Sequence, residues 1–129
     1  MMINNIQFKR NTKNVNWLDM KNSYILSDWD TGRTPEQLKK AFDGSYTVCF
    51  SYINTEIIGT ARAISDGVDS AAVYDVWIKP EYRDRGIGKK MMTLLLADLH
   101  GQYILLTTRV YDFYKKFGFE KTDAMVINN

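Results

Sequence analysis

One stretch of the chain, residues 79–90, brings together the residue types that bind phosphate groups. It follows an apolar segment and contains Gly86 and Gly88, at the point where an apolar-periodic helix is predicted to begin. The first turn of a helix leaves backbone N–H groups unpaired and carries the positive end of the helix dipole. Because glycine has no Cβ atom, phosphate oxygens can approach these N–H groups closely.

The charges of this stretch support the same interpretation. Five basic residues accompany two acidic ones, a local excess in a protein whose net charge is only +2. The basic residues are Lys79, Arg83, Arg85, Lys89 and Lys90, and the acidic ones are Glu81 and Asp84. We therefore predict a cradle for a diphosphate, with a structural turn and solvated charges as the alternative. The stretch has neither the P-loop pattern nor the third glycine of the dinucleotide-binding fingerprint.

Length and composition exclude several other kinds of protein. The 129 residues suit one domain, expected to span residues 1–129, and 45% hydrophobic with 25% charged residues is an ordinary globular balance. The small net charge argues against a nucleic-acid partner. A single cysteine, Cys49, and a single histidine, His100, exclude an intramolecular disulfide and argue against a metal site or a Ser-His-Asp triad. No apolar run approaches the ~20 residues of a membrane span, and the first ten residues lack a signal-peptide pattern, so we expect a cytoplasmic protein without a membrane partner.

Apolar periodicity predicts the elements that must position the phosphate-binding turn. Expected strands cover residues 3–8, 46–51, 56–64, 71–78, 103–107 and 125–127, and expected helices cover 16–27, 35–43, 86–99 and 111–117. Thr34, Pro35 and Gln37 form a helix-start signal, and Gly59 marks a candidate bulge. The order β-α-α-β-β-β-α-β-α-β, a hairpin meander followed by a β-α-β-α unit, predicts an α/β (α+β) fold with a mixed sheet and helices on both faces.

Two motifs in this order resemble those of the GNAT superfamily of acetyl-CoA-dependent N-acetyltransferases. Arg83-x-x-Gly86-x-Gly88, directly after the strand that ends near Ile78, resembles the acetyl-CoA motif of that family. The segment Phe-Tyr-Lys-Lys-Phe-Gly-Phe at residues 113–119 resembles its second signature, and the resemblance covers roughly residues 45–119. Shorter segments at residues 45–46, 61–63, 65–67 and 74–76 are similar to those of small bacterial and plastid amine and protein acetyltransferases. The resemblance implies a mostly antiparallel sheet.

The resemblance also implies how acetyl-CoA, with CoA as product and no metal, would be held. Backbone groups of Val76, Trp77 and Ile78 would pair with the pantetheine arm, and an N–H near Trp77 would stabilise the thioester oxygen during attack. The turn and the first helical residues would hold the diphosphate. These residues are Arg83, Asp84, Arg85, Gly86, Ile87, Gly88, Lys89 and Lys90.

For the chemistry, the resemblance implies direct transfer of acetyl from sulfur to a primary amine. Tyr114 matches the family's tyrosine, which would also contact the cofactor; a phenol with a pKa near 10 keeps its proton at neutral pH and can donate it to the departing sulfur. The alternative for Tyr114 is a core aromatic. Asp75 is the candidate base or a site for a cationic substrate, with a carboxylate paired to Arg62 or to a backbone amide as the alternative. Tyr74 stands where relatives have Glu, which weakens the case for direct base catalysis.

The expected acceptor is an amine of a small molecule or of a protein. Trp29, Arg62 and Tyr74 are candidate substrate contacts, because aromatic rings and charges suit a cationic amine; an ordinary surface is the alternative for each of them. Homodimers are common in the family, which makes a homodimer an expectation. Two other functions stay open: a non-catalytic acyl-CoA sensor or partner-binding module on the same fold, and a nucleic-acid-binding domain that rests only on the basic turn.

Overall fold

A computed structural model describes residues 5–129 as a five-stranded sheet flanked by helices. The sheet order is β1-β2-β3-β4-β5, and every neighbouring pair is antiparallel except β4 and β5, which are parallel. This is the mixed, mostly antiparallel α/β fold that the sequence predicts. The elements are β1 (Ile6–Lys9), α1 (Trp17–Leu26), α2 (Pro35–Asp43), β2 (Thr47–Ile53), β3 (Glu56–Ser65), β4 (Ser70–Ile78), η2 (Pro80–Tyr82), α3 (Ile87–Ala97), β5 (Tyr103–Leu105) and α4 (Tyr111–Lys115).

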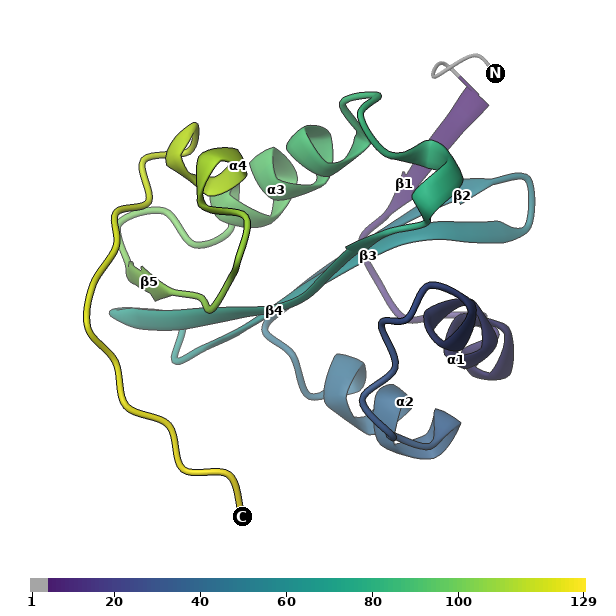
Figure 1. The fold of residues 1–129 in the computed structure, drawn as a ribbon, viewed down its shortest axis with the longest axis horizontal. Helices are drawn as coiled ribbons and strands as arrows, with labels where there is room; N and C mark the ends of the chain where they lie inside the picture. The colour runs from purple at the N-terminus through teal and green to yellow at the C-terminus, as the bar shows by residue number, and fades with distance from the viewer. Residues whose placement is uncertain (1–4) are drawn as a thin grey trace.

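Helices cover both faces of the sheet, as Figure 1 shows: α3 and α4 lie on one face, and α1 and α2 on the other. Each face has its own hydrophobic core. On the α3 side, Met91, Met92 and Leu95 pack with inward-facing strand residues, among them the buried Cys49. On the α1 and α2 side, Tyr24, Phe42 and Trp77 are almost fully buried. Burial of apolar area on both faces is what holds the sheet between its helices.

Local sequence signals explain several element boundaries. Asn16 caps α1, and Thr34 and Gln37 form the predicted reciprocal capping box of α2, with Pro35 in the first turn. Asn54 has a positive φ of 53° in the tight turn between β2 and β3, a conformation that asparagine tolerates better than most residues. The predicted helices and hairpin therefore form within a few residues of their expected positions.

Two predictions at the ends of the chain have different outcomes. The strand predicted at residues 3–8 forms as β1, although residues 3 and 4 lie outside the described part of the chain. The strand predicted at residues 125–127 is wrong: within residues 5–129, this segment pairs with no other strand, and all its side chains are exposed. A strand needs a neighbour for its backbone hydrogen bonds, and the segment has none among residues 5–129.

Gly59 sits where the sheet and α3 meet most closely. The β2–β3 register shifts next to it, between Ser51 and Tyr52, so the predicted bulge lies beside Gly59. A Cβ atom at Gly59 would come within 2.8 Å of Ile78 Cδ1 and 3.0 Å of Met91 Sδ, and it would also collide with Ser51 Oγ. The absence of a side chain at residue 59 therefore lets α3 pack directly on β3 and β4.

We expect Gly59→Ala to lower the free energy of unfolding by about 1–3 kcal/mol, because the added methyl group overpacks this contact. Ser51→Ala alone should be close to neutral, since its buried hydroxyl has no hydrogen-bond partner among the described residues. The double variant should lose less stability than the two single losses combined, because one of the colliding atoms is gone. Urea unfolding of the wild type, the two single variants and the double variant measures this cycle. Strictly additive losses of unfolding free energy would refute the contact between residue 59 and Ser51.

Candidate active site

The strand β4 has an edge that no strand of residues 5–129 occupies. β5 pairs with β4 only at Ser70, Ala71 and Ala72, whereas β3 pairs with β4 as far as Ile78. From residue 73 to residue 78, the backbone groups of β4 that point toward the β5 side therefore lack a strand partner. Such a free edge can accept an extended ligand as if the ligand were a further strand.

The orientation of these backbone groups follows from two hydrogen bonds. The N–H of Lys79 donates to the Ile58 carbonyl of β3 at 2.7 Å. Successive strand residues direct their backbone groups to opposite sides, so Ile78 and Val76 point toward the free edge and Trp77 toward β3. Arg83 Nε donates to the Ile78 carbonyl at 2.9 Å, in agreement with this orientation. The N–H groups available to a thioester carbonyl are thus those of the two residues that flank Trp77.

A bulge at Asp75 sets the course of β4 where it leaves β5. The β3–β4 register shifts between Thr60 and Arg62, and Asp75 has a positive φ of 55°. Aspartate tolerates this left-handed conformation better than most residues, although inside a strand it still interrupts the regular extended backbone. A bulge bends a strand and increases its twist, and this one lies in the half of β4 that β5 does not pair with.

Two arginines hold the side chain of Asp75. Arg33 donates to both carboxylate oxygens at 2.8 and 2.9 Å, and Arg62 Nε donates to Oδ2 at 2.7 Å. Burial would by itself raise the pKa of Asp75, but the hydrogen bonds and charges of these two arginines outweigh it and hold that pKa below its ordinary value of 3.8. The carboxylate therefore stays ionised at neutral pH, and two cations occupy its oxygens.

The backbone of Asp75 is fixed as well. Thr60 Oγ1 lies 2.9 Å from the Asp75 carbonyl and 2.8 Å from the hydroxyl of Tyr24, which is buried under β4. The Tyr24 ring meets Trp77 edge to face with 5.1 Å between ring centroids. The loop between α1 and α2, the helix α1 and the strand β3 thus all converge on the bulge.

The turn after β4 ends at the N-terminus of α3, as predicted. Asp84 and Gly86 have positive φ values of 61° and 82°, and a Cβ atom at Gly86 would meet nothing within 4 Å. The first intrahelical hydrogen bond runs from Lys90 N–H to the Gly86 carbonyl, so the preceding N–H groups, through Lys89, have no acceptor in the helix. This open helix start can hold an anion.

Four of the five predicted cations surround this helix start without a carboxylate partner. Arg83, Arg85, Lys89 and Lys90 are exposed and form no ion pair within residues 5–129. Lys79 differs, because its Nζ lies 2.6 Å from a carboxylate oxygen of Glu56. The positive charge available to a phosphate therefore comes from the four residues at positions 83–90.

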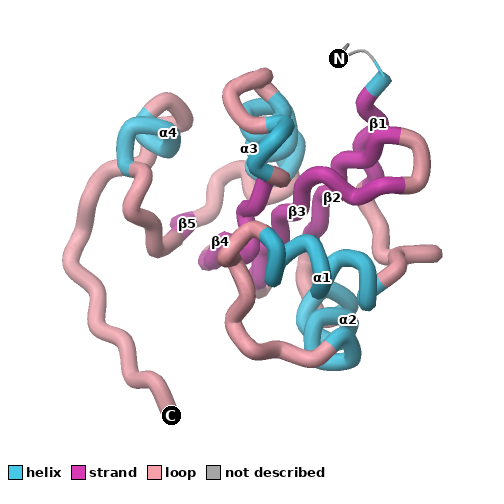
Figure 2. The backbone as a smooth tube through the Cα atoms, turned by 45° about the vertical axis from the view of Figure 1, so that its right-hand side comes forward, coloured by secondary structure: helices cyan, strands magenta, loops and turns pink. Residues whose placement is uncertain are grey.

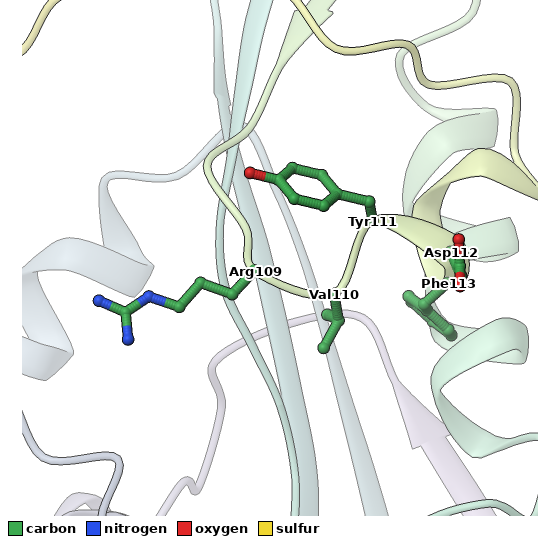
Figure 3. A pocket seen from close by; sticks show the side chains of 5 residues that line it. All are labelled: Arg109, Val110, Tyr111, Asp112 and Phe113. Carbon is green, nitrogen blue, oxygen red and sulfur yellow. The ribbon is translucent and has the colours of Figure 1, made fainter.

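Gly88 has a different function in the structure from Gly86. A Cβ atom at Gly88 would lie 3.3 Å from the Phe113 ring and 3.7 Å from Ile78. Its lack of a side chain thus lets α4 approach the first turn of α3, and Phe113 lies beside α3 in Figure 3.

Tyr114, the residue after Phe113, is 7% exposed and belongs to the core cluster on the α3 side. Its hydroxyl forms no hydrogen bond with any residue in the described chain, and burial raises the pKa of Tyr114 to about 12.

Comparison with known sequences decides the family. A profile of the acetyltransferase (GNAT) family matches residues 13–119. The chain belongs to the GNAT family. This result confirms the resemblance seen in the two sequence motifs, and it extends beyond them to the helices α1 and α2.

Individual relatives of this GNAT protein support the assignment. The uncharacterized N-acetyltransferase ycf52 of Porphyra purpurea is 32% identical over 86% of this chain and 68% of its own length. Serotonin N-acetyltransferase 2, chloroplastic, of Oryza sativa subsp. japonica is 33% identical over 67% of this chain and 48% of its own length. GCN5-related N-acetyltransferase 2, chloroplastic, of Arabidopsis thaliana is 37% identical over 50% of this chain, and the match spans only 27% of the plant protein. A crystal structure from Deinococcus radiodurans R1 has the same fold, with a TM-score of 0.87 at 23% identity over 99% of this chain and 91% of the other.

Three residues predicted to contact substrate have different surroundings in this GNAT protein. The guanidinium of Arg62 lies 5.1 Å from the centre of the Tyr74 ring and 5.7 Å from that of Phe42, besides its ion pair with Asp75. The alternative of an Arg62–Asp75 pair is thus the one that the structure contains. Tyr74 is 44% and Trp29 39% exposed, so both present apolar area to solvent.

Sequence analysis did not single out the most important partner of Asp75. Arg33 is 42 residues away and lies in a loop that has no periodic pattern, so only its positive charge hinted at a role. Thr60 also went unnoticed, because a single hydroxyl on a strand carries no motif. No helix in the described part of the chain is long and apolar enough to cross a membrane.

We expect Asp75→Asn to lower the free energy of unfolding at pH 7 by about 2–4 kcal/mol, because it leaves two partly buried arginines without a counter-charge. Asp43→Asn, which removes an exposed pair with Lys39, should cost less than about 1 kcal/mol.

The pH dependence gives a second check on this prediction. Since the pKa of Asp75 is lowered by folding, its contribution is present above the ordinary value of 3.8 and is lost as the pH falls through the lower folded value. The wild type and Asp75→Asn should therefore converge in stability below pH 3.8. Urea unfolding between pH 7 and pH 3 measures this convergence. Equal losses of unfolding free energy at pH 7 for Asp75→Asn and Asp43→Asn would contradict the proposed pairing.

Proposed function

We propose that this protein transfers an acetyl group from acetyl-CoA to a primary amine of a small molecule or a protein. One observation carries the proposal: the free edge of β4 leads directly to the open N-terminus of α3, with four unpaired cations around it. An extended pantetheine arm suits the strand edge, and a diphosphate suits the helix start. Acetyl-CoA would supply the activated thioester.

The residues of the chain fit this ligand in two places. Backbone groups of Val76 and Ile78 would bind the arm, and the N–H next to the thioester would stabilise negative charge on its oxygen, an effect worth about 3–4 kcal/mol where single donors have been removed. Backbone N–H groups at residues 86–89 would hold the diphosphate, with Arg83, Arg85 and Lys90 nearby.

Tyr114 is the proposed general acid. Its high pKa keeps the phenol protonated at neutral pH, and its hydroxyl is not engaged by any other described residue. As the amine nitrogen bonds to the acetyl carbon and the carbon–sulfur bond breaks, Tyr114 would donate its proton to the sulfur and recover one from solvent. The acceptor amine would release its own proton to water.

We propose a positioning role for Asp75 in place of base catalysis. Its carboxylate accepts three hydrogen bonds from two arginines, and its low pKa makes it a weak proton acceptor. The carboxylate would thereby keep the bulge in place and hold β4 away from β5.

Two exposed aromatic side chains support a class of acceptor. Tyr74 and Trp29 offer aromatic surface, which suits an amine carried on an apolar or cationic group. The names of relatives include a serotonin N-acetyltransferase, which supports a small arylalkylamine as one acceptor to be tried.

A cytoplasmic location stays a prediction.

We expect Gly86→Val to weaken CoA binding at least tenfold, because a branched side chain at this position would block phosphate access to the helix start. Gly101→Val is a matched control: Gly101 has nearly the same φ, 81°, and also nothing within 4 Å of an added Cβ atom. Both variants carry the same backbone strain, so only the first should lose affinity in isothermal titration calorimetry. Equal CoA affinity in the two variants would remove the diphosphate from this turn.

We expect Tyr114→Phe to lower kcat by about 10²-fold or more with little change in CoA affinity, because the phenyl ring keeps the packing and lacks the proton. Tyr52→Phe is the control, since the Tyr52 hydroxyl is buried in β2 without a partner among the described residues. Thiol release from acetyl-CoA is measured against a panel of amines. If CoA binds but no amine accelerates thiol release, the protein is instead an acyl-CoA-binding module.

A further inference from the structure

The peptide group between Asp75 and Val76 lies in the bulge of β4, where the regular strand pairing does not orient it. The β3–β4 register is interrupted between Thr60 and Arg62, and neither Asp75 nor Val76 has a partner in it among the described residues. Backbone carbonyls that are shielded from water need a hydrogen-bond donor. The Asp75 carbonyl therefore depends on a donor outside the regular backbone pairing.

A threonine side chain supplies that donor. Thr60 Oγ1 lies 2.9 Å from the Asp75 carbonyl oxygen, and because a carbonyl oxygen can only accept, the Thr60 hydroxyl donates this hydrogen bond. The same hydroxyl lies 2.8 Å from that of Tyr24. Since the single proton of Thr60 is already used, Tyr24 is the donor in this second contact. Two hydroxyl groups, the Tyr24–Thr60 relay, thus lead in one direction to the Asp75 carbonyl.

The Tyr24–Thr60 relay is buried and firmly packed. Thr60 is 0% and Tyr24 1% exposed. Burial and the charge of Asp75 raise the pKa of Tyr24 above its ordinary value of 10, so the phenol keeps the proton that it donates. The Tyr24 ring also packs edge to face on Trp77. In Figures 1 and 2, α1, which carries Tyr24, lies on the sheet face opposite α3, so the relay holds the bulge from the side away from the helix start.

The planarity of the peptide group makes this anchor an orientation of Val76. In a trans peptide, which the Asp75–Val76 bond is, the carbonyl of the first residue and the N–H of the second point in opposite directions. Because Thr60 belongs to β3, the Asp75 carbonyl points toward β3 and the Val76 N–H points toward the free edge of β4. The alternation of strand residues counted back from Lys79 gives Val76 the same direction.

We propose that Thr60, supported by Tyr24, is the positioning residue that aims the Val76 N–H at the thioester oxygen; this role rests on the proposed acetyl transfer. Ile78, the other strand residue with an N–H at the free edge, lies two residues closer to the helix start, where the diphosphate would bind. Val76 is therefore the donor for the thioester end of the ligand. A donor that is fixed before the amine attacks stabilises the growing negative charge on oxygen without reorganisation. Both hydroxyl groups act through the backbone and do not touch the substrate.

Four substitutions isolate the relay. Thr60→Val keeps the branched side chain and removes the donor, whereas Thr60→Ser keeps the donor. Tyr24→Phe removes only the first hydroxyl of the relay and keeps the ring against Trp77. Thr47→Val is the matched control, because the buried hydroxyl of Thr47 on β2 donates to Asp98 at 2.7 Å, at the C-terminal end of α3.

The first experiment uses the protein without ligand. Loss of a hydrogen bond moves the ¹³C resonance of a backbone carbonyl upfield, so NMR of the labelled protein reports directly on the Asp75 carbonyl. We expect an upfield shift in Thr60→Val, a smaller one in Tyr24→Phe because hydrogen bonds in series strengthen one another, and none in Thr60→Ser or Thr47→Val. Circular dichroism checks that each variant is folded, and Tyr24→Phe decides the question if Thr60→Val does not fold. An unmoved Asp75 resonance in the folded variants would overturn the relay.

The second experiment uses acetyl-CoA labelled with ¹³C at the thioester carbonyl, with no amine present. This resonance moves downfield when the oxygen accepts a hydrogen bond. We expect a downfield shift on binding to the wild type, Thr60→Ser and Thr47→Val, and a clearly smaller shift on binding to Thr60→Val. Equal shifts in Thr60→Val and the wild type would refute the positioning role, and no acceptor needs to be known for this result.

Turnover with an active amine gives the kinetic counterpart. We expect Thr60→Val to lower kcat by about 10- to 100-fold, because a misaimed donor loses most of its effect, while the affinity for CoA, which has no acetyl oxygen, stays unchanged. Thr60→Ser should restore most of the rate. If acetyl-CoA binds and turns over equally well in Thr60→Val and the wild type, the positioning role fails and the acetyl transfer stands. If the wild type does not bind acetyl-CoA, the proposed function fails and the positioning role with it.

Discussion

The ion pairs between Asp75 and its two arginines are the constraint on which the site depends. They hold a residue other than glycine in a left-handed conformation in the middle of β4. β5 pairs with β4 only as far as Ala72, and the bulge lies in the part of β4 beyond that pairing. We propose that the half-buried carboxylate of Asp75, with its two arginines, keeps this part of β4 in the course that an extended ligand needs.

The turn that follows β4 adds the open helix start at which we propose that the diphosphate binds. Gly86 leaves the space in front of the helix start empty, whereas the missing side chain of Gly88 leaves room for the Phe113 ring to pack against the helix. Gly86 therefore keeps the helix start accessible to a ligand, and Gly88 lets α4 lie close to α3. Because Tyr114 follows Phe113 directly, the same contact places the proposed acid near the start of α3.

How far the sequence predicts the structure depends on the range of the interactions. Thr34 and Gln37 are three residues apart and the apolar stripe of α3 repeats within one helix, so both were predictable. Arg33 meets Asp75 across 42 residues, and no local pattern encodes such a contact. The left-handed backbone of Asp75 likewise depends on that tertiary contact. Residues 125–127 have the composition of a strand, but a strand also needs a partner, which residues 5–129 do not supply.

The proposed function depends on CoA binding along the free edge of β4 and at the start of α3. The most direct measurement is a two-dimensional NMR titration of the ¹⁵N-labelled protein with CoA, which reports on every backbone amide at once. We expect the largest shifts at the amides of Val76, Ile78 and residues 86–89, with small changes in α1 and β1. Shifts concentrated elsewhere, for example on the outer edge of β5, would contradict it.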